Sequence, residues 1–368
     1  MCTLTRWLLL RKSRYHQHKP MITIYAPGHI DPYDSYGLLA MQLLRHLNRG
    51  GVEAHAIALG KTHLDTQPED VAALMSRPLR PTFGGILLGY PTNYAAYGAL
   101  ANAGTRIALT MFESSKIPPE WVPILNELDA VVVPSQFCKE VFAECGVEVP
   151  IHVVSLGINE VYQPVKRPRN RPLTFLAFLD RGARKGGHAA IQAFCLAFGD
   201  RTDVHLILKS RDPKVRLNAT NENIDIIQKD MTERELAALY GRCDVMINAN
   251  KGEGFGLIPR EFAATGGIAL TTDWSGTADH LDKWGWPLPY TLVPADWTGI
   301  QKFDDVDLGV WAEPDIEAIA GRLVEIANNR NTYQTAAYSR AANVHQLYSW
   351  PRFANHVHAI WENAANGH

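Results

Sequence analysis

The sequence predicts an α/β protein built from two doubly wound, Rossmann-like halves. Strand and helix patterns alternate on both sides of a break, and 368 residues suit two domains of roughly 150–200 residues each. The break is the stretch 163–172, which holds three prolines and four basic residues. We therefore expect a first domain at 21–165, a linker at 166–172, a second domain at 173–346, and a terminal helix at 347–368 that packs back on the first domain.

The first half opens with an apolar strand at 21–26, a polar loop and a helical pattern at 38–47. A strand at 52–59 completes a βαβ unit, whose loop should lie at the carboxyl end of the sheet. Tyr36 and Gly37 occupy the helix start, where backbone N–H groups favour a phosphate or an acceptor group. The other expected strands are 84–89, 106–111, 130–134 and 151–154, with helices from Pro118 and after Ser135.

The second half begins with a strand at 173–179, and the basic loop 180–187 leads from it into a helix. A capping box at 232–235 opens a later helix. Strands are expected at 204–208, 224–227, 244–248 and 268–272, and helices from Asp315 and after Trp350. The aromatic and proline-rich stretch 274–308 has no clear pattern.

A glycine-rich loop between a strand and a helix, at 250–261, is the most informative stretch of the chain. Backbone N–H groups at such a helix start form an anion site, and Gly254 and Gly256 let the backbone approach a ligand closely. Glu253 and Glu261 bracket the loop with seven residues between them. Carboxylates beside an anion site make sense if they face hydroxyls, and a nucleotide-sugar offers a diphosphate between two polyols.

The bulk composition sets limits on function and location. The net charge of −2 argues against broad binding to a nucleic-acid backbone. The five cysteines include no CxxC pair and no zinc spacing, so reduced thiols in a cytoplasmic protein are expected. We interpret residues 1–20 as a disordered or dispensable arm. No stretch is long and apolar enough for a transmembrane span, and peripheral membrane attachment is the alternative location.

The ordered set of motifs resembles the family 4 retaining glycosyltransferases (glycosyl transferases group 1), whose GT-B architecture has two Rossmann-like domains facing a cleft. Glu253 and Glu261 match the family's pair of glutamates, in the form Glu-Gly-Phe-Gly-Leu and a second Glu. Arg181 and Lys185 match its basic pair, and the turn at 36–37 resembles its N-terminal glycine turn. Two departures concern the acceptor side: the N-terminal turn has one glycine, and Phe-Glu-Ser at 112–114 replaces a common histidine.

The resemblance implies a role for each matching residue. Arg181 and Lys185 would hold the diphosphate, Glu261 the ribose hydroxyls, and Glu253 the donor sugar near its anomeric centre. The amides of Gly254, Phe255, Gly256 and Leu257 would hold the distal phosphate, and Met231 would frame the nucleobase. Each role has a structural alternative. Arg181 and Lys185 would belong to a solvated basic loop, Glu261 would interact with the helix dipole, and Glu253 would be an ordinary loop carboxylate.

Glu113 follows the fourth strand of the first half and has several possible roles. It would orient the acceptor or the donor sugar, or act as a base. The structural alternatives are a helix cap and a salt bridge between domains.

These observations predict a metal-independent, retaining transferase that moves a sugar from a UDP- or GDP-sugar to the hydroxyl of a glycan, a lipid or another small acceptor. No permanently bound cofactor is expected. Two alternatives stay open: a glycosyltransferase that acts on modified bases of nucleic acid, and a non-catalytic nucleotide-sugar binding protein. An NAD-dependent Rossmann enzyme is disfavoured because no GxGxxG follows the first strand.

Overall fold

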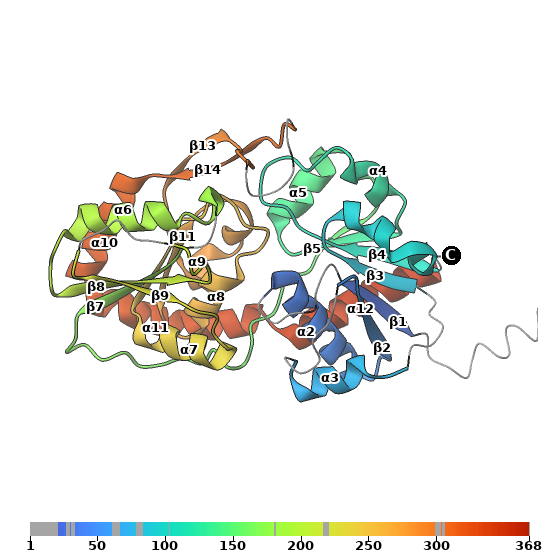
Figure 1. Cartoon of the computed structure of the whole chain (residues 1–368), viewed down its shortest axis with the longest axis horizontal. Coiled ribbons are helices and arrows are strands. Elements are labelled where there is room, and N and C mark those ends of the chain that lie inside the picture. Colours follow the sequence, from blue (N-terminus) through green and yellow to red (C-terminus); the bar gives the residue numbers. More distant parts are fainter. Residues whose placement is uncertain are drawn as a thin grey trace, which may run out of the picture. The chain divides into compact units, whose positions relative to one another are not determined.

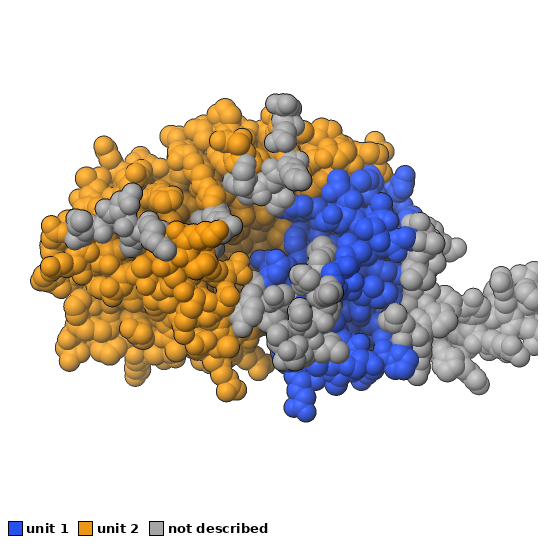
Figure 2. Space-filling view, in the orientation of Figure 1, with its two compact units in different colours: residues 1–110, 124–132, 354–368 blue, residues 111–123, 133–353 orange. Residues whose placement is uncertain are grey.

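The computed structural model describes residues 21–26, 30, 34–60, 67–78, 84–102, 104–179, 182–215, 221–298, 303 and 306–367. The predicted arm at 1–20 lies outside them. Contacts divide the chain into two compact units, coloured separately in Figure 2. The first comprises Met1–Thr110, Ile124–Val132 and Ala354–His368, and the second comprises Met111–Pro123 and Val133–Phe353.

The first six-stranded sheet has the order β2-β1-β3-β4-β5-β6. Strand β1 pairs in parallel with β2 and with β3, so the strand order reverses between β1 and β3. The elements up to β6 are β1 (Ile22–Ala26), α2 (Ser35–Arg49), β2 (Ala54–Ala58), α3 (Glu69–Met75), β3 (Gly84–Leu88), η2 (Pro91–Asn102), β4 (Thr105–Leu109), α4 (Trp121–Asn126), β5 (Ala130–Val133), α5 (Gln136–Glu144) and β6 (Ile151–Val153).

The second six-stranded sheet has the order β12-β11-β10-β7-β8-β9, which is the 3-2-1-4-5-6 order of the Rossmann fold. Its elements begin with β7 (Leu173–Phe178), η3 (Ala183–Lys185), α6 (Gly187–Phe198), β8 (Val204–Ser210), β9 (Ile224–Gln228), α7 (Glu233–Arg242) and β10 (Val245–Asn248). They continue with α8 (Leu257–Ala264), β11 (Ile268–Thr272), η4 (Ser275–Thr277), α9 (Leu281–Trp284) and β12 (Trp286–Leu288).

Helices cover both faces of this second sheet. Helix α6 packs against α10 (Ile316–Asn328) on one face, and α11 (Arg330–Leu347) packs against α8 (Figure 1). Strands β7, β8 and β11 are buried along nearly their whole length, as expected for a parallel sheet covered on both faces. On one face, Phe175 and Leu206 belong to a core shared with Phe194 of α6 and Leu323 of α10. The last helix, α12, runs over Trp350–Asn366.

The stretch 274–308, which has no clear pattern in the sequence, contains ordered structure. It supplies β12 and one strand of an antiparallel hairpin, β13 (Tyr290–Pro294) with β14 (Val310–Pro314). The hairpin is tied to the segment Met111–Pro123, because the Ser115 amide donates to Val310 O (3.0 Å) and the Lys116 amide to Leu308 O (3.2 Å). These bonds bring the segment that carries Glu113 into the second unit.

Asp244, directly before β10, is a buried structural carboxylate. Its side chain is 0% exposed, and it accepts hydrogen bonds from two arginines, one glutamine and one backbone amide. The donors are Arg171 (2.8 and 3.1 Å), Arg330 (3.3 Å), Gln334 (2.7 Å) and the Thr174 amide (2.9 Å). The network joins the start of β7 to α11 and fixes the position of β10.

Replacing Asp244 with alanine is expected to lower the free energy of unfolding by about 3–5 kcal/mol, because two partly buried guanidinium groups lose their fully buried counter-charge. Urea unfolding followed by circular dichroism measures the change. Asp203→Ala is the matched control, since it removes an exposed ion pair with Arg201 and should cost less than about 1 kcal/mol. A loss below about 1 kcal/mol for Asp244→Ala would contradict the structural role.

Candidate active site

The predicted site lies where the strand order of the second sheet reverses. Strands β7 and β10 pair in parallel at this point, with Phe175 opposite Val245. The loop after β7 carries Lys185, and the loop after β10 carries Glu253. Ligands of open α/β sheets bind at the carboxyl ends of strands beside such a reversal, so the topology places both predicted motifs at the expected edge.

Every backbone carbonyl of the glycine-rich loop Gly252–Gly256 accepts a hydrogen bond from the protein. The bonds are Arg184 Nη1 to Gly252 O (2.6 Å), the Gly276 amide to Glu253 O (2.8 Å), the Ser135 hydroxyl to Gly254 O (2.7 Å), and Arg260 Nη1 to Phe255 O and to Gly256 O (3.3 Å). The loop is therefore held from behind by partners on several different elements.

The amides from Gly254 onward differ from these carbonyls, whereas the Glu253 amide donates to Ser275 Oγ (3.0 Å). Within the described ranges, the backbone N–H groups of residues 254–257 donate to no protein acceptor. Gly256 is the N-cap of α8 and provides no side-chain cap. A run of unpaired amides at a helix start is an anion-binding arrangement, because the N–H groups and the helix dipole both favour negative charge.

Gly254 and Gly256 are required by the protein's own packing. A Cβ on Gly254 would lie 2.7 Å from Met111 Cβ. Gly256 has a φ of +82°, a conformation that side chains rarely adopt, and a Cβ there would collide with Thr277. The structure thus gives these glycines a reason that the sequence did not, namely close contact with neighbouring side chains.

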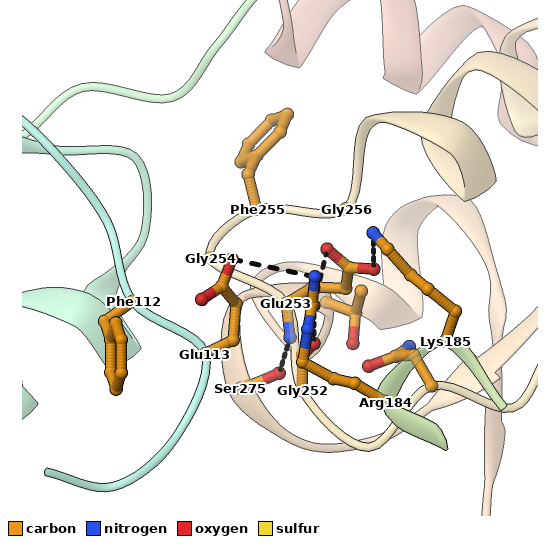
Figure 3. Close-up of polar contacts among 12 residues, drawn as sticks. Phe112, Glu113, Arg184, Lys185, Gly252, Glu253, Gly254, Phe255, Gly256 and Ser275 are labelled. Atoms are coloured by element: carbon orange, nitrogen blue, oxygen red, sulfur yellow. Dashed lines mark hydrogen bonds and ion pairs between the residues drawn. The ribbon is translucent and has the colours of Figure 1, made fainter. Parts of the chain in front are cut away.

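Four charged side chains meet beside the loop (Figure 3). Lys185 Nζ lies 2.7 Å from Glu253 Oε1. The guanidinium of Arg184 lies between two carboxylates, with Nη1 3.5 Å from Glu253 Oε2 and Nη2 3.9 Å from Glu113 Oε1. The ring of Phe255 points away from these charges, so Phe255 can contribute only its backbone to this cluster.

The two carboxylates of this cluster have pKa values that are shifted in opposite directions. Burial raises the pKa of Glu113, and although Arg184 opposes this, the charge of Glu253 adds to it. Burial alone would raise the pKa of Glu253 too, but Lys185 and Arg184 outweigh it and hold that pKa below its ordinary value. Such a divergence is typical of carboxylates that serve as proton acceptor and as permanent charge.

Glu261 lies on α8 in a second acidic group. It is buried, and burial together with the nearby carboxylate of Glu233 raises its pKa to about 8, although the Tyr162 hydroxyl donates to it and opposes the rise. Glu233 itself accepts a hydrogen bond from the Asn159 side chain. Glu261 is thus a protonated carboxyl near neutral pH that gains a charge under mildly alkaline conditions.

Of the other predicted site residues outside α8 and its loop, the structure describes Met231, Tyr36 and Gly37. Arg181 lies outside the described residues. Met231 is half-buried between β9 and the cap of α7. Tyr36 and Gly37 belong to the first unit, where the Gly37 amide already donates to Asp34 (2.9 Å) and Tyr36 contacts Tyr90 edge-on. The Gly37 amide is therefore engaged by the helix cap.

Arg184 joins the charged cluster of the candidate site, although the sequence motifs did not include it. Its position next to Lys185, in a basic loop at the end of a strand, was the available signal. Its partners Glu113 and Gly252 lie 71 and 68 positions away in the chain. Neither contact can be inferred from local pattern.

Comparison with known proteins finds similar solved structures that cover nearly the whole chain. No protein-family model matches the sequence, and no curated protein does. Among solved structures, a glycosyltransferase from Rickettsia africae matches with a TM-score of 0.69 and 16% identity, over 96% of this chain and 100% of that one. The sucrose-phosphate synthase of Thermosynechococcus elongatus matches with a TM-score of 0.67 and 14% identity, over 95% and 100%.

A trehalose-phosphate synthase of Burkholderia vietnamiensis, described as UDP-forming, matches with a TM-score of 0.67 and 11% identity, over 95% of this chain and 99% of that one. Both six-stranded sheets are covered by these matches. The chain has the GT-B fold. The predicted fold class is thereby confirmed, while identities of 11–16% carry no conclusion about activity.

Two further properties of this GT-B chain concern metals and membranes. Among the residues that the structure describes, no three His, Cys, Asp or Glu side chains are grouped so as to hold a metal ion. None of the described helices is both long enough and apolar enough to span a bilayer.

Proposed function

We propose that this chain is a retaining glycosyltransferase that moves a sugar from a nucleotide diphosphate sugar to an acceptor hydroxyl, in the manner of family 4. The observation that carries the proposal is the run of unpaired amides at 254–257 beside Lys185 and Arg184, at the strand reversal of a GT-B sheet. Such a site fits a diphosphate, because amides, cations and a helix start all favour negative charge.

Different residues bind different parts of the donor. The loop amides and Lys185 hold the diphosphate and stabilise the charge that grows on it as the glycosidic bond breaks. Arg181 joins them through its match to the family motif. When ionised, Glu261 accepts hydrogen bonds from the two ribose hydroxyls. Glu253 accepts hydrogen bonds from hydroxyls of the donor sugar. Met231 borders the base.

The chemistry that fits this arrangement is a displacement on one face of the sugar. The bond from the anomeric carbon to the diphosphate oxygen breaks, and the acceptor oxygen forms its bond on the same face. The acceptor proton passes to the leaving diphosphate oxygen, so no protein nucleophile is needed. Glu113, whose pKa is raised by burial, orients the acceptor hydroxyl beside this proton transfer.

A UDP-sugar is the first donor to test, because one of the similar structures is described as UDP-forming. A thermal-shift screen of UDP- and GDP-sugars identifies the donor, since a ligand at 100 times its Kd stabilises the protein by about 2.7 kcal/mol. The hit is then incubated with glycan, lipid and sugar-phosphate acceptors, and NMR of the product gives the anomeric configuration. Stabilisation without transfer would favour a nucleotide-sugar binding protein.

Lys185→Ala is expected to weaken donor binding about 100-fold, because the variant loses a charge-assisted contact to the diphosphate. Isothermal titration calorimetry with the donor found in the screen measures the change. Lys283→Ala is the matched control, since Lys283 forms an exposed ion pair with Asp282 in the same unit (2.9 Å). If the donor Kd of Lys185→Ala stays within about threefold of the wild-type Kd, the diphosphate does not bind at Lys185.

A further inference from the structure

Arg260 is a fully buried arginine directly behind the glycine-rich loop. It is 0% exposed, and its guanidinium carbon lies over three aromatic rings of the same unit. The distances to the ring centres are 4.2 Å for Phe255, 4.6 Å for Trp284 and 5.0 Å for Tyr348. This aromatic cage holds the cation by its π faces, which attract positive charge.

The hydrogen bonds of Arg260 all go to backbone carbonyls. Nη1 donates to Phe255 O and Gly256 O of the anion loop, and Nη2 donates to Gly276 O (2.9 Å) and Asp279 O (3.1 Å) of the following loop. One side chain therefore joins two loops at the same end of the sheet. The planar fork of a guanidinium suits this task, since its donors diverge at fixed angles.

These bonds determine the direction in which the amides of the anion loop point. Within one trans peptide unit the C=O and N–H groups point in opposite directions. The carbonyls of Phe255 and Gly256 turn toward Arg260, so the N–H groups of Gly256 and Leu257 must turn away from it. Those amides belong to the unpaired run at 254–257.

The charge of Arg260 is not neutralised within the described part of the chain. No carboxylate forms an ion pair with it, and its only partners are carbonyl dipoles and aromatic faces. Buried charges in proteins are normally paired, because burial without a counter-charge is costly. Because Arg260 lies behind the anion loop, an anionic ligand bound in front of the loop would supply the missing negative charge.

We propose that Arg260 is the positioning residue of the anion loop: it turns the Gly256 and Leu257 amides toward the diphosphate, and its buried charge favours ligands with more negative charge. This inference rests on the proposed function and goes beyond it, since the motif residues do not include position 260. Arg260 does not touch the ligand. It acts through the loop carbonyls and through its field.

The test compares ligands of increasing charge: uridine, UMP and UDP, with guanosine, GMP and GDP in parallel. We expect Arg260→Met to weaken UDP binding about 100-fold and UMP binding about tenfold while uridine binding changes less than about threefold. Arg260→Lys keeps the charge and loses the fork, so UDP binding should fall about tenfold. Calorimetry gives each Kd, and thermal melts show whether the variants fold.

Arg340→Met is the matched control, because Arg340 stacks on Trp286 at 4.1 Å and donates to Gly285 O without touching the anion loop. Its UDP affinity should equal that of wild type. Equal weakening of all three uridine ligands by Arg260→Met, or unchanged UDP binding, overturns the inference while the proposed function stands. If Arg260→Met does not fold, Arg260→Lys with wild-type UDP affinity overturns it. Failure of wild type to bind either series refutes the proposed function instead.

Discussion

Glu253→Gln is expected to tighten nucleoside diphosphate binding about tenfold and to lower sugar transfer at least about 100-fold. Without ligand, Glu253 is the counter-ion of Lys185 at 2.7 Å and of Arg184 at 3.5 Å. A diphosphate must compete with this carboxylate for the same cations, so removing the negative charge favours UDP or GDP. Transfer falls because the amide no longer places a charge and two acceptor oxygens beside the sugar.

Because Glu253→Gln should tighten diphosphate binding and slow sugar transfer, the two measurements are expected to change in opposite directions. Calorimetry with the diphosphate gives the binding change, and release of diphosphate during turnover gives the rate. Asp203→Asn is the control, because it removes the charge of an exposed pair with Arg201 (2.7 Å) and should alter neither quantity. A variant that loses diphosphate affinity and turnover together would mean that Glu253 holds the loop in shape and does not compete with the ligand.

Glu261→Gln is expected to abolish the pH dependence of ribose recognition. Burial and the neighbouring Glu233 raise the pKa of Glu261 to about 8, so below that pH the carboxyl is protonated and accepts ribose hydroxyls poorly. Affinity for uridine or guanosine should therefore rise about eightfold between about pH 7 and about pH 8.5 in wild type and stay flat in the variant. The nucleoside is used because it has no titrating phosphate, and this pH range lies below the pKa of the N–H groups of its base.

The matched ligand for this experiment is the 2′-deoxynucleoside, which has one hydroxyl fewer for Glu261 to bind. Its affinity should show a smaller rise with pH than that of the ribonucleoside. A rise of the same size for both ligands, or a rise that persists in Glu261→Gln, would place the titrating group elsewhere.

The same substitution carries a stability prediction. The folded pKa of about 8 lies above the ordinary value of 4.5, so the native state binds the proton more tightly than the unfolded state. The stability linked to this proton is fully present below about pH 4.5 and is lost as the pH rises toward about 8. Glu261→Gln avoids that loss, so it should melt at a higher temperature than wild type at about pH 9 and at a similar one at about pH 5. A lower melting temperature at both pH values would refute the linkage.

Local patterns were enough to predict most of the second sheet and the loops that lie at its strand reversal. Glycines, a first-turn proline and a short apolar run predicted the strand, loop and helix around Glu253, and the structure has β10, the loop and α8 there. The hairpin β13–β14 was not predicted. Its strands pair directly with each other, and hydrogen bonds from the distant segment that carries Glu113 hold β14 and the residue Leu308 before it. Helix α11 was also missed, since most of its residues are polar or small and give no apolar stripe.

By itself the sequence determined the alternation of strands and helices in two α/β halves and the glycine-rich and basic loops of the second half, because strand and helix periods and turn residues act over short stretches of chain. The GT-B class followed from the resemblance of the ordered motifs to a known family. Only the tertiary structure decided the electrostatics of the site. It placed Arg184 between Glu113 and Glu253, shifted the pKa values of those carboxylates apart, and put an unneutralised arginine behind the amides. Burial and charge proximity arise from residues far apart in the chain, so no local pattern encodes them.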